Sequence, residues 1–364
     1  MKGSAEGVTA FRAALAASAT TALAAVAVAS RYSRSGRAPH LVCARDAEGL
    51  QELLLECDLL RQPYWPHPLH VHWLVNAAVA AVKSMPAASR ESHERRLRLK
   101  DGGTVSLDWW GVAPEGLAAA KRFQRPVVLV LPGLNNSSRS LFIRNLMGRL
   151  DRAGFQAVAL NYRAVQHLEL TSPRLGCADS WEDLPEVLDA IGSTCPGARI
   201  FAVGYSMGST ILTKYLGEFG PKSRICAGAA ISPVLAYEEH GEELLKSPWL
   251  SFAMTLPVKA WVWHKRAQMG KHVPQLQLGA MLSSRSLHEF GETTLTLTNG
   301  YANMEEYFRK NNPATTMEHV ACPLLLIAAR DDPLIQPVPY AEIRANKRIV
   351  LAETEGGGHI GWAG

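Results

Sequence analysis

Short apolar runs recur along the chain after residue 125, and between them lie stretches whose apolar residues return every three to four positions. The runs are rich in β-branched residues and alanine and are apolar on both faces, which is typical of strands buried between two helical layers. The expected strands are Pro126–Leu131, Phe155–Leu160, Arg199–Gly204, Ile225–Ser232, Pro323–Ala329 and Lys347–Glu353. The expected helices are Ser138–Arg152, Trp181–Ile191 and Met207–Phe219. This alternation predicts a mostly parallel, doubly wound α/β sheet.

An antiparallel hairpin is expected before this series. Two alternating runs that start at Arg96 are joined by Asp101–Gly102–Gly103, a sequence that favours a tight turn. We therefore place an α/β domain over residues 96–364. Residues 38–95 are expected to form a linker and entry segment, in which Ala47–Leu60 has helical spacing and several prolines follow.

One connection is longer than a simple crossover requires. About ninety residues separate the strand that ends at Ser232 from the strand that begins at Pro323, whereas a crossover needs roughly 15 to 25. We expect this insertion, residues 233–322, to form a helical lid over the carboxyl ends of the strands. The alternative is a helical layer that buries only its own aromatic side chains. Those side chains are Trp249, Phe252, Trp261, Trp263, Phe290, Tyr307 and Phe308.

The pentapeptide Gly204–Tyr205–Ser206–Met207–Gly208 lies between a predicted strand and a predicted helix. A serine nucleophile needs this setting, because a sharp turn raises its hydroxyl above the sheet and larger side chains two residues away would collide. The N-terminus of the following helix favours negative charge that develops there. Ser206 is therefore the candidate nucleophile.

A serine hydroxyl needs a base to remove its proton and a carboxylate to orient that base. The sequence ARDDP, Ala329–Pro333, follows a predicted strand and contains two aspartates. We prefer Asp332 because it stands directly before the proline turn, and Asp331 remains the alternative. His359 is the candidate base, because Gly356–Gly358 lets the loop after the next strand bring its imidazole to both partners.

Acyl transfer also requires hydrogen-bond donors for an oxyanion. The backbone N–H of Met207 is one candidate, and the N–H of Leu134, after the first parallel strand, is the second. The polar residues Asn135–Ser137 could instead cap the helix that follows. We find no metal-ligand spacing, no phosphate-binding loop and no cofactor motif in the sequence.

Composition restricts the classes of protein that fit. The 364 residues include 47% hydrophobic and 20% charged residues, as in an ordinary globular protein. The net charge of +5 arises from scattered basic residues, so we expect no nucleic-acid partner. The six cysteines form no CxxC pair, and we expect free thiols that pack as small apolar groups, with Cys226 and Cys322 opening buried strands.

The N-terminal segment differs in kind from the rest. Residues Ala13–Ser30 carry no charge, and arginines follow at Arg31, Arg34 and Arg37. A helix of this length nearly spans the hydrocarbon core of a bilayer, although its alanine, serine and threonine content makes insertion only marginally favourable. We expect residues 1–37 to be a single-pass membrane anchor, and the alternative is a transit peptide that is removed in an organelle.

Several motifs together resemble one enzyme family. These are LPGLNNSS, GYSMGSTILTKYLGEFG, the segment from GYANMEEYF to LLLIAARDDP, and GGGHIGW. They are similar to the YheT-like branch of the α/β-hydrolase superfamily, which includes bacterial short-chain esterases, plant embryogenesis-associated hydrolases and animal abhydrolase lipases and phospholipases. The resemblance covers roughly Leu59 to the C-terminus.

The resemblance implies an α/β-hydrolase fold in which Ser206, Asp332 and His359 form the charge relay. It also implies hydrolysis of acylglycerols, phospholipids or short-chain esters and frequent membrane anchoring. A transacylase with the same triad and a non-catalytic binding protein of the same fold are the alternatives. The family continues through a final helix, whereas five residues follow His359, so we expect a truncated C-terminus.

Overall fold

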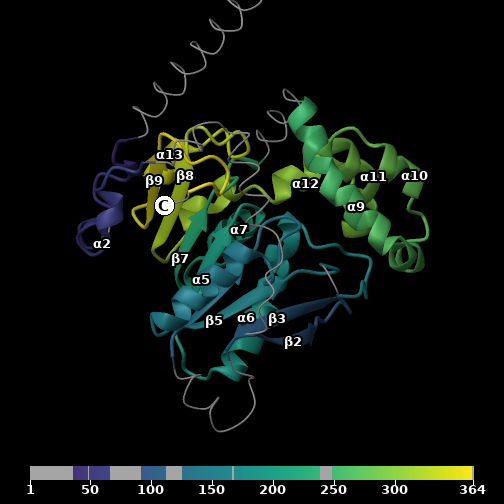
Figure 1. Cartoon of the computed structure of the whole chain (residues 1–364), viewed down its shortest axis with the longest axis horizontal. Helices are drawn as coiled ribbons and strands as arrows, with labels where there is room; N and C mark the ends of the chain where they lie inside the picture. Colours follow the sequence, from purple (N-terminus) through teal and green to yellow (C-terminus); the bar gives the residue numbers. More distant parts are fainter. Residues whose placement is uncertain are drawn as a thin grey trace, which may run out of the picture.

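The computed structural model describes residues 36–47, 49–65, 92–111, 125–165, 168–237 and 248–362. These residues form a sheet with helices on both faces and a separate group of helices to one side (Figure 1). The expected anchor, residues 1–37, lies outside the described residues except for its last two positions. Among the helices that the structure describes, none is long and apolar enough to cross a membrane.

Nine strands build one mixed sheet in the order β1-β9-β8-β7-β6-β4-β5-β3-β2. The five neighbour pairs between β5 and β9 are parallel, and the strands at both edges are antiparallel. The strands are β1 His40–Cys43, β2 Ser92–Arg98, β3 Thr104–Trp110, β4 Val127–Leu131, β5 Gln156–Asn161, β6 Ile200–Tyr205, β7 Ile225–Ile231, β8 Leu324–Ala329 and β9 Ile349–Thr354. Every strand expected from the apolar runs is present, with ends that differ by at most two residues.

The strand β1 was not predicted from the sequence. Its residues lie in the segment expected to be a linker, yet His40 pairs with Glu353 and Cys43 with Val350 along β9. This strand of four residues covers the sheet edge that β9 would otherwise expose. Local pattern does not identify such a strand, because its pairing partner lies about three hundred residues away in the sequence.

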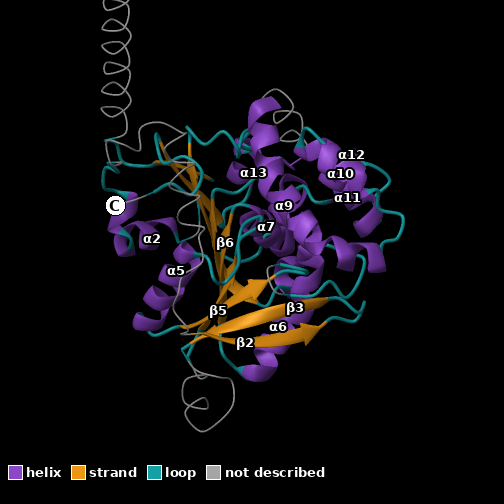
Figure 2. Ribbon diagram, turned by 45° about the vertical axis from the view of Figure 1, so that its right-hand side comes forward, coloured by secondary structure: helices purple, strands orange, loops and turns teal. Residues whose placement is uncertain are grey.

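Alternate residues of the central strands face two different helical layers. On β4, Val128 and Val130 pack with Ile143 and Met147 of α5 on one face. Leu129 and the other odd-numbered positions of β4 face the opposite layer. Figure 2 shows α5 and α7 on opposite sides of the sheet.

The helices of the two layers are α5 Leu141–Arg152, α6 Leu184–Thr194, α7 Met207–Phe219 and α13 Tyr340–Ala345. Outside the sheet lie α2 Leu50–Glu56 and the short 3-10 helices Asp58–Leu60, Ala178–Asp183, Gly220–Lys222 and Pro313–His319.

The predicted insertion is a helical cap, which confirms the expected lid as part of the fold. Its helices are α9 Pro248–His272, α10 Leu278–Ser283, α11 Leu287–Asn299 and α12 Met304–Lys310. Val258, Val262 and Phe290 of the cap form one buried cluster with Leu170 and Leu175 from the loop after β5. The cap therefore rests on the loops that follow the strands, beside α7 (Figure 1).

Candidate active site

The turn between β6 and α7 holds Ser206 in a strained backbone conformation. Its φ is 52° and its ψ is −121°, a region that side-chain-bearing residues rarely adopt. A Cβ on Gly204 would lie 2.5 Å from the carbonyl oxygen of Gly208, and one on Gly208 would lie 2.1 Å from the carbonyl oxygen of Leu131. Both glycines are thus required by the close approach of strand, turn and helix, as the sequence indicated.

Three residues from separate parts of the chain meet in a chain of hydrogen bonds. The Oγ of Ser206 lies 2.8 Å from Nε2 of His359, and Nδ1 of the same ring lies 2.8 Å from Oδ2 of Asp332. The Asp332 side chain is fully buried, whereas the imidazole remains 18% exposed. A base that reaches both the hydroxyl and a buried carboxylate can accept the hydroxyl proton and be stabilised as a cation.

The two adjacent aspartates have different partners. Oδ1 of Asp332 accepts a hydrogen bond from the backbone N–H of Leu334 at 2.9 Å, while its Oδ2 faces His359. The carboxylate of Asp331 instead accepts a hydrogen bond from the backbone N–H of Gly358 at 2.8 Å. Asp332 forms the hydrogen bond with the imidazole, so the geometry favours it over Asp331 as the acid.

The loop that carries His359 is also held on its far side. The backbone N–H of Ile360 donates to Oγ of Ser232, 3.1 Å away at the end of β7. Ile360 and Ser232 both have positive φ, of 58° and 50°. The indole of Trp362 donates to Oγ1 of Thr354 on β9. The histidine is therefore fixed by backbone contacts before and after it, which keeps its ring in place for proton transfer.

The loop after β4 lies directly against the nucleophile. A Cβ on Gly133 would lie 3.1 Å from the Cβ of Ser206, and Leu134 lines the same cavity as Ser206 and Met207. The side chain of Asn136 donates to the carbonyl oxygen of Leu134 at 3.1 Å. This proximity agrees with the proposed oxyanion role for the amides of Leu134 and Met207. Asn136 stabilises that loop itself, and its Oδ1 also accepts a hydrogen bond from Ser140, the N-cap residue of α5.

A tyrosine that the sequence did not single out supports this loop. The hydroxyl of Tyr162 donates to the carbonyl oxygen of Pro132 at 3.0 Å, and its side chain is 1% exposed. Burial raises the pKa of this hydroxyl well above its usual value, so it stays protonated and can donate. Tyr162 directly follows β5, and only the register of β5 beside β4 brings it to the loop.

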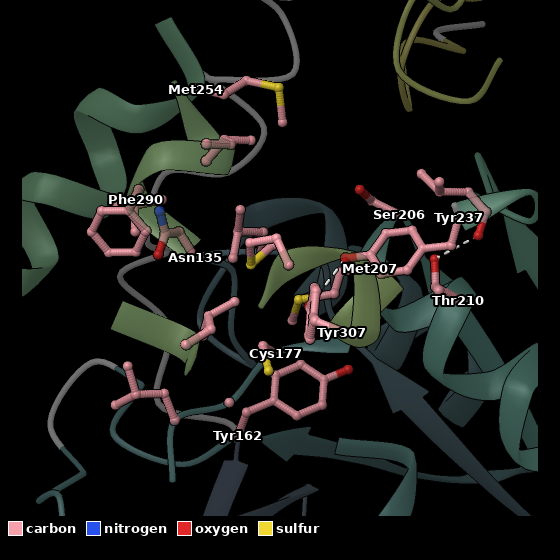
Figure 3. Close-up of a pocket in the computed structure, with 18 of the residues that line it drawn as sticks. Asn135, Tyr162, Cys177, Ser206, Met207, Thr210, Tyr237, Met254, Phe290 and Tyr307 are labelled. Atoms are coloured by element: carbon pink, nitrogen blue, oxygen red, sulfur yellow. Dashed lines mark hydrogen bonds between the residues drawn. The ribbon is translucent and has the colours of Figure 1, made fainter. Parts of the chain in front are cut away.

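A cavity of about 180 Å³ opens between the sheet and the cap. A single water needs roughly 10–15 Å³ of such space, so the cavity has room for an organic substituent. From the cap, Met254, Val258, Trp261 and Phe290 line it, and Ser206 lies on the opposite side (Figure 3). The cap thus covers Ser206, as the predicted lid position requires.

One wall of the cavity carries neutral polar groups. The hydroxyls of Tyr237 and Tyr307 lie 3.1 Å apart, and both rings lie near Ser206 and Met207 in Figure 3. Burial raises the pKa of both tyrosines. Both hydroxyls are therefore uncharged at neutral pH.

Behind this wall lies a buried polar network that the sequence did not predict. The carboxylate of Asp179 accepts hydrogen bonds from Cys177, Asn299 and Tyr301 and forms an ion pair with Arg174. Asp179 and Asn299 are 120 residues apart in the sequence, so no local pattern indicates their contact. The network ties the C-terminal end of α11 Leu287–Asn299 in the cap to the loop below the cavity.

Comparison with known families agrees with this geometry. A family model described as the alpha/beta hydrolase fold matches residues 126–260. Among curated proteins, Phospholipase ABHD3 of Mus musculus is 29% identical over 73% of this chain and 65% of its own length. Embryogenesis-associated protein EMB8 of Picea glauca is 25% identical, over 86% of this chain and 70% of that protein. Monoacylglycerol lipase ABHD2 of Homo sapiens is 26% identical, over 90% of this chain and 81% of that protein.

Solved structures with a similar arrangement include esterases. An esterase from Pyrococcus furiosus has a TM-score of 0.48 and 18% identity, over 74% of this chain and 83% of that chain. An esterase from Pyrobaculum calidifontis has a TM-score of 0.46 and 15% identity, over 79% of this chain and 82% of that chain.

The chain spans about 65% of the length of the ABHD3 phospholipases that it matches. The curated relatives include both a plant embryogenesis-associated protein and abhydrolase lipases. This agreement confirms the resemblance that the motifs indicated. The matched segment contains β4, the nucleophile turn and the start of the cap, which are the features that position the Ser206 site. Residues 126–260 therefore match the alpha/beta-hydrolase family model, and the nine-stranded sheet around them has the fold that this model describes.

Proposed function

We propose that this chain is a serine hydrolase that cleaves the carboxylic-ester bonds of acylglycerols, phospholipids or short-chain esters through an acyl-enzyme. The observation that carries the proposal is the contact of Ser206 with His359, which in turn contacts the buried Asp332, at the wall of an apolar cavity. The names of the curated relatives, a phospholipase and a monoacylglycerol lipase, support the same class of substrate.

In the first half of the reaction, Nε2 of His359 takes the proton of the Ser206 hydroxyl as Oγ attacks the ester carbonyl carbon. The negative charge passes to the carbonyl oxygen, which the N–H groups of Met207 and Leu134 stabilise. Asp332 stabilises the imidazolium that forms. The carbon–oxygen bond to the alcohol then breaks, and His359 returns the proton to the departing alcohol.

In the second half, water takes the place of the alcohol. His359 removes a proton from that water as its oxygen attacks the acyl carbon, and the same amides hold the second oxyanion. The bond between Oγ of Ser206 and the acyl carbon breaks, the proton returns to Oγ, and the carboxylic acid leaves. The free enzyme is restored without any cofactor.

The cavity supports an apolar acyl group as the part of the substrate bound inside. The cap contributes aliphatic, thioether and aromatic side chains, whose contact with an acyl chain is favourable in proportion to the apolar area buried. The guanidinium of Arg163, which lines the cavity, is 4% exposed and already pairs with Asp101 and Asp183.

Membrane association is part of the same proposal. The segment Ala13–Ser30 is a proposed single-pass anchor, and an organelle location after removal of a transit peptide is the alternative. This segment lies outside the described residues. N-terminal sequencing of the native protein tests it, because a mature start between residues 25 and 45 would contradict an anchor.

Fluorophosphonate labelling combined with an ester panel tests the proposed activity. The full chain should be labelled at Ser206 and hydrolyse esters, and Ser206→Ala should lose the label and several orders of magnitude in turnover. Product analysis in the presence of added alcohol separates hydrolysis from transacylation. Labelling at another serine, or undiminished turnover by Ser206→Ala, would contradict the assignment.

A further inference from the structure

The buried face of the cap helix α9 carries polar side chains among its apolar ones. The inward positions Ser251, Thr255 and Lys265 are 2%, 0% and 3% exposed. Each has a hydrogen-bond partner: Ser251 accepts from Leu287, Thr255 donates to the carbonyl oxygen of Phe252, and Lys265 donates to that of Leu168. These polar groups are thus satisfied inside the cap, where they lie beside buried apolar residues of the same helix.

The outward face of α9 is an apolar stripe. Phe252, Leu256 and Trp263 are 44%, 51% and 54% exposed, and Ala260 and Ala267 between and beyond them are exposed as well. Their spacing of four, four, three and four residues places all five on one side of the helix. Single exposed apolar residues are ordinary, whereas an aligned set of this kind indicates a surface that meets an apolar phase.

Cations border this stripe. The guanidinium of Arg266 lies 4.3 Å from the ring centre of Trp263, and the ammonium of Lys259 lies 5.6 Å from that of Phe252. Lys271 is exposed one turn beyond Ala267. The helix α9 contains no aspartate or glutamate. An apolar stripe whose neighbouring charges on α9 are positive is complementary to an anionic lipid surface.

The same helix also lines the cavity. Met254, Val258 and Trp261, which occupy other faces of α9, line the cavity with Ser206. The outer stripe and the cavity wall are therefore two faces of one helix, and a surface bound to the first lies within a helix diameter, about 10–12 Å, of the second.

We propose that the outer face of α9, defined by Phe252, Leu256 and Trp263, docks onto an anionic phospholipid surface and places the cavity beside it. The docking itself is independent of catalysis, and its role in delivering substrate rests on the proposed ester hydrolysis. Docking buries the stripe in the region between headgroups and acyl chains, where Trp and Phe are favourable, and brings the exposed Arg266 and Lys271 to the phosphates.

Tryptophan emission from the full-length chain tests the docking without turnover. Vesicles of phosphatidylcholine and phosphatidylserine with brominated acyl chains quench tryptophans that enter the bilayer. The chain has nine tryptophans, so the difference between wild type and Trp263→Phe isolates Trp263. We expect the Trp263 component to be quenched by the mixed vesicles, and less by phosphatidylcholine alone or at high salt. Quenching that is identical in wild type and Trp263→Phe would overturn the proposal.

Hydrolysis measured on two forms of ester tests the role in substrate delivery. The double variant Phe252→Ser/Leu256→Ser should lose about tenfold or more in rate on an ester embedded in anionic vesicles, because two apolar groups no longer enter the bilayer. Its rate on a water-soluble short-chain ester should not change. Leu55→Ser is the matched control, because Leu55 is 70% exposed on α2, outside the cap. An equal loss on both esters would show a folding defect and count against the proposal.

Two further outcomes are informative. If Ser206→Ala retains the quenching of Trp263 while no chain hydrolyses esters, docking holds and the proposed activity fails. If sedimentation shows a wild-type dimer that the double variant loses, and vesicles leave Trp263 emission unchanged, the stripe contacts a second copy of the chain and the lipid proposal is overturned.

Discussion

The carboxylate of Asp331 accepts a hydrogen bond from the backbone N–H of Gly358, the residue directly before the active-site histidine, at 2.8 Å. Two adjacent aspartates thus act on one loop, since Asp332 contacts the ring of His359 while its neighbour holds the backbone. This division separates the effects expected from mutating them.

Asp332→Asn should lower kcat on a soluble ester by about 10³–10⁴-fold, because the imidazole loses its orienting partner and the stabilisation of its cationic form. Asp331→Asn should lower kcat less than tenfold, because an amide oxygen can still accept from Gly358. Thermal unfolding of both variants checks that the fold persists. A loss at Asp331 as large as that at Asp332 would contradict the assignment of the acid.

Tyr162→Phe should lower kcat by about three- to tenfold with little change in KM, because the loop that carries the Leu134 amide loses its anchor at Pro132. Steady-state kinetics on a soluble ester give the two constants. Tyr340→Phe is the control, since that hydroxyl donates to Glu353 away from the cavity. Equal effects in the two variants, or a change confined to KM, would argue against a positioning role for Tyr162.

The tryptophans of the cap should differ in their effects on chain-length preference. Both were expected to act in the lid, but Trp261 lines the cavity and donates to the carbonyl oxygen of Ala164 at 3.0 Å, whereas Trp263 is 54% exposed. Trp261→Ala should raise KM for long-chain soluble esters several-fold more than for acetate esters, because the apolar contact grows with chain length. Trp263→Ala should leave KM unchanged for both long-chain soluble esters and acetate esters. If Trp261→Ala changed KM equally for all chain lengths, Trp261 would have only a packing role.

Cys177 should resist alkylation although it lines the cavity. Burial, with Asp179 beside it, raises the pKa of this thiol well above its usual value, so the reactive thiolate is scarce at neutral pH. Cys226 is exposed at the start of β7, where the sequence had predicted a buried position. Iodoacetamide on the native chain, followed by peptide mass spectrometry, should modify Cys226 before Cys177. The reverse order would show that the Cys177 thiol ionises readily.

The sequence alone indicated the parallel strands of the sheet and Ser206 as the candidate nucleophile. Buried parallel strands such as Val127–Leu131 are continuous apolar runs, and the glycines around Ser206 reflect a turn whose sterics are local. His359 was predictable for a related reason, since it follows a strand within a glycine-rich loop. In each case the physical cause acts within a few residues and leaves its mark on the sequence.

The tertiary structure decided everything that depends on contacts between distant segments. The pairing of His40–Cys43 with β9, the hydrogen bond of Tyr162 to Pro132 and the separate partners of Asp331 and Asp332 all follow from the register of the assembled sheet. Which tryptophan of α9 faces the cavity depends on how the cap rests on the loops below it. The free energy of such contacts depends on distance in space, and no periodicity along the chain encodes that distance.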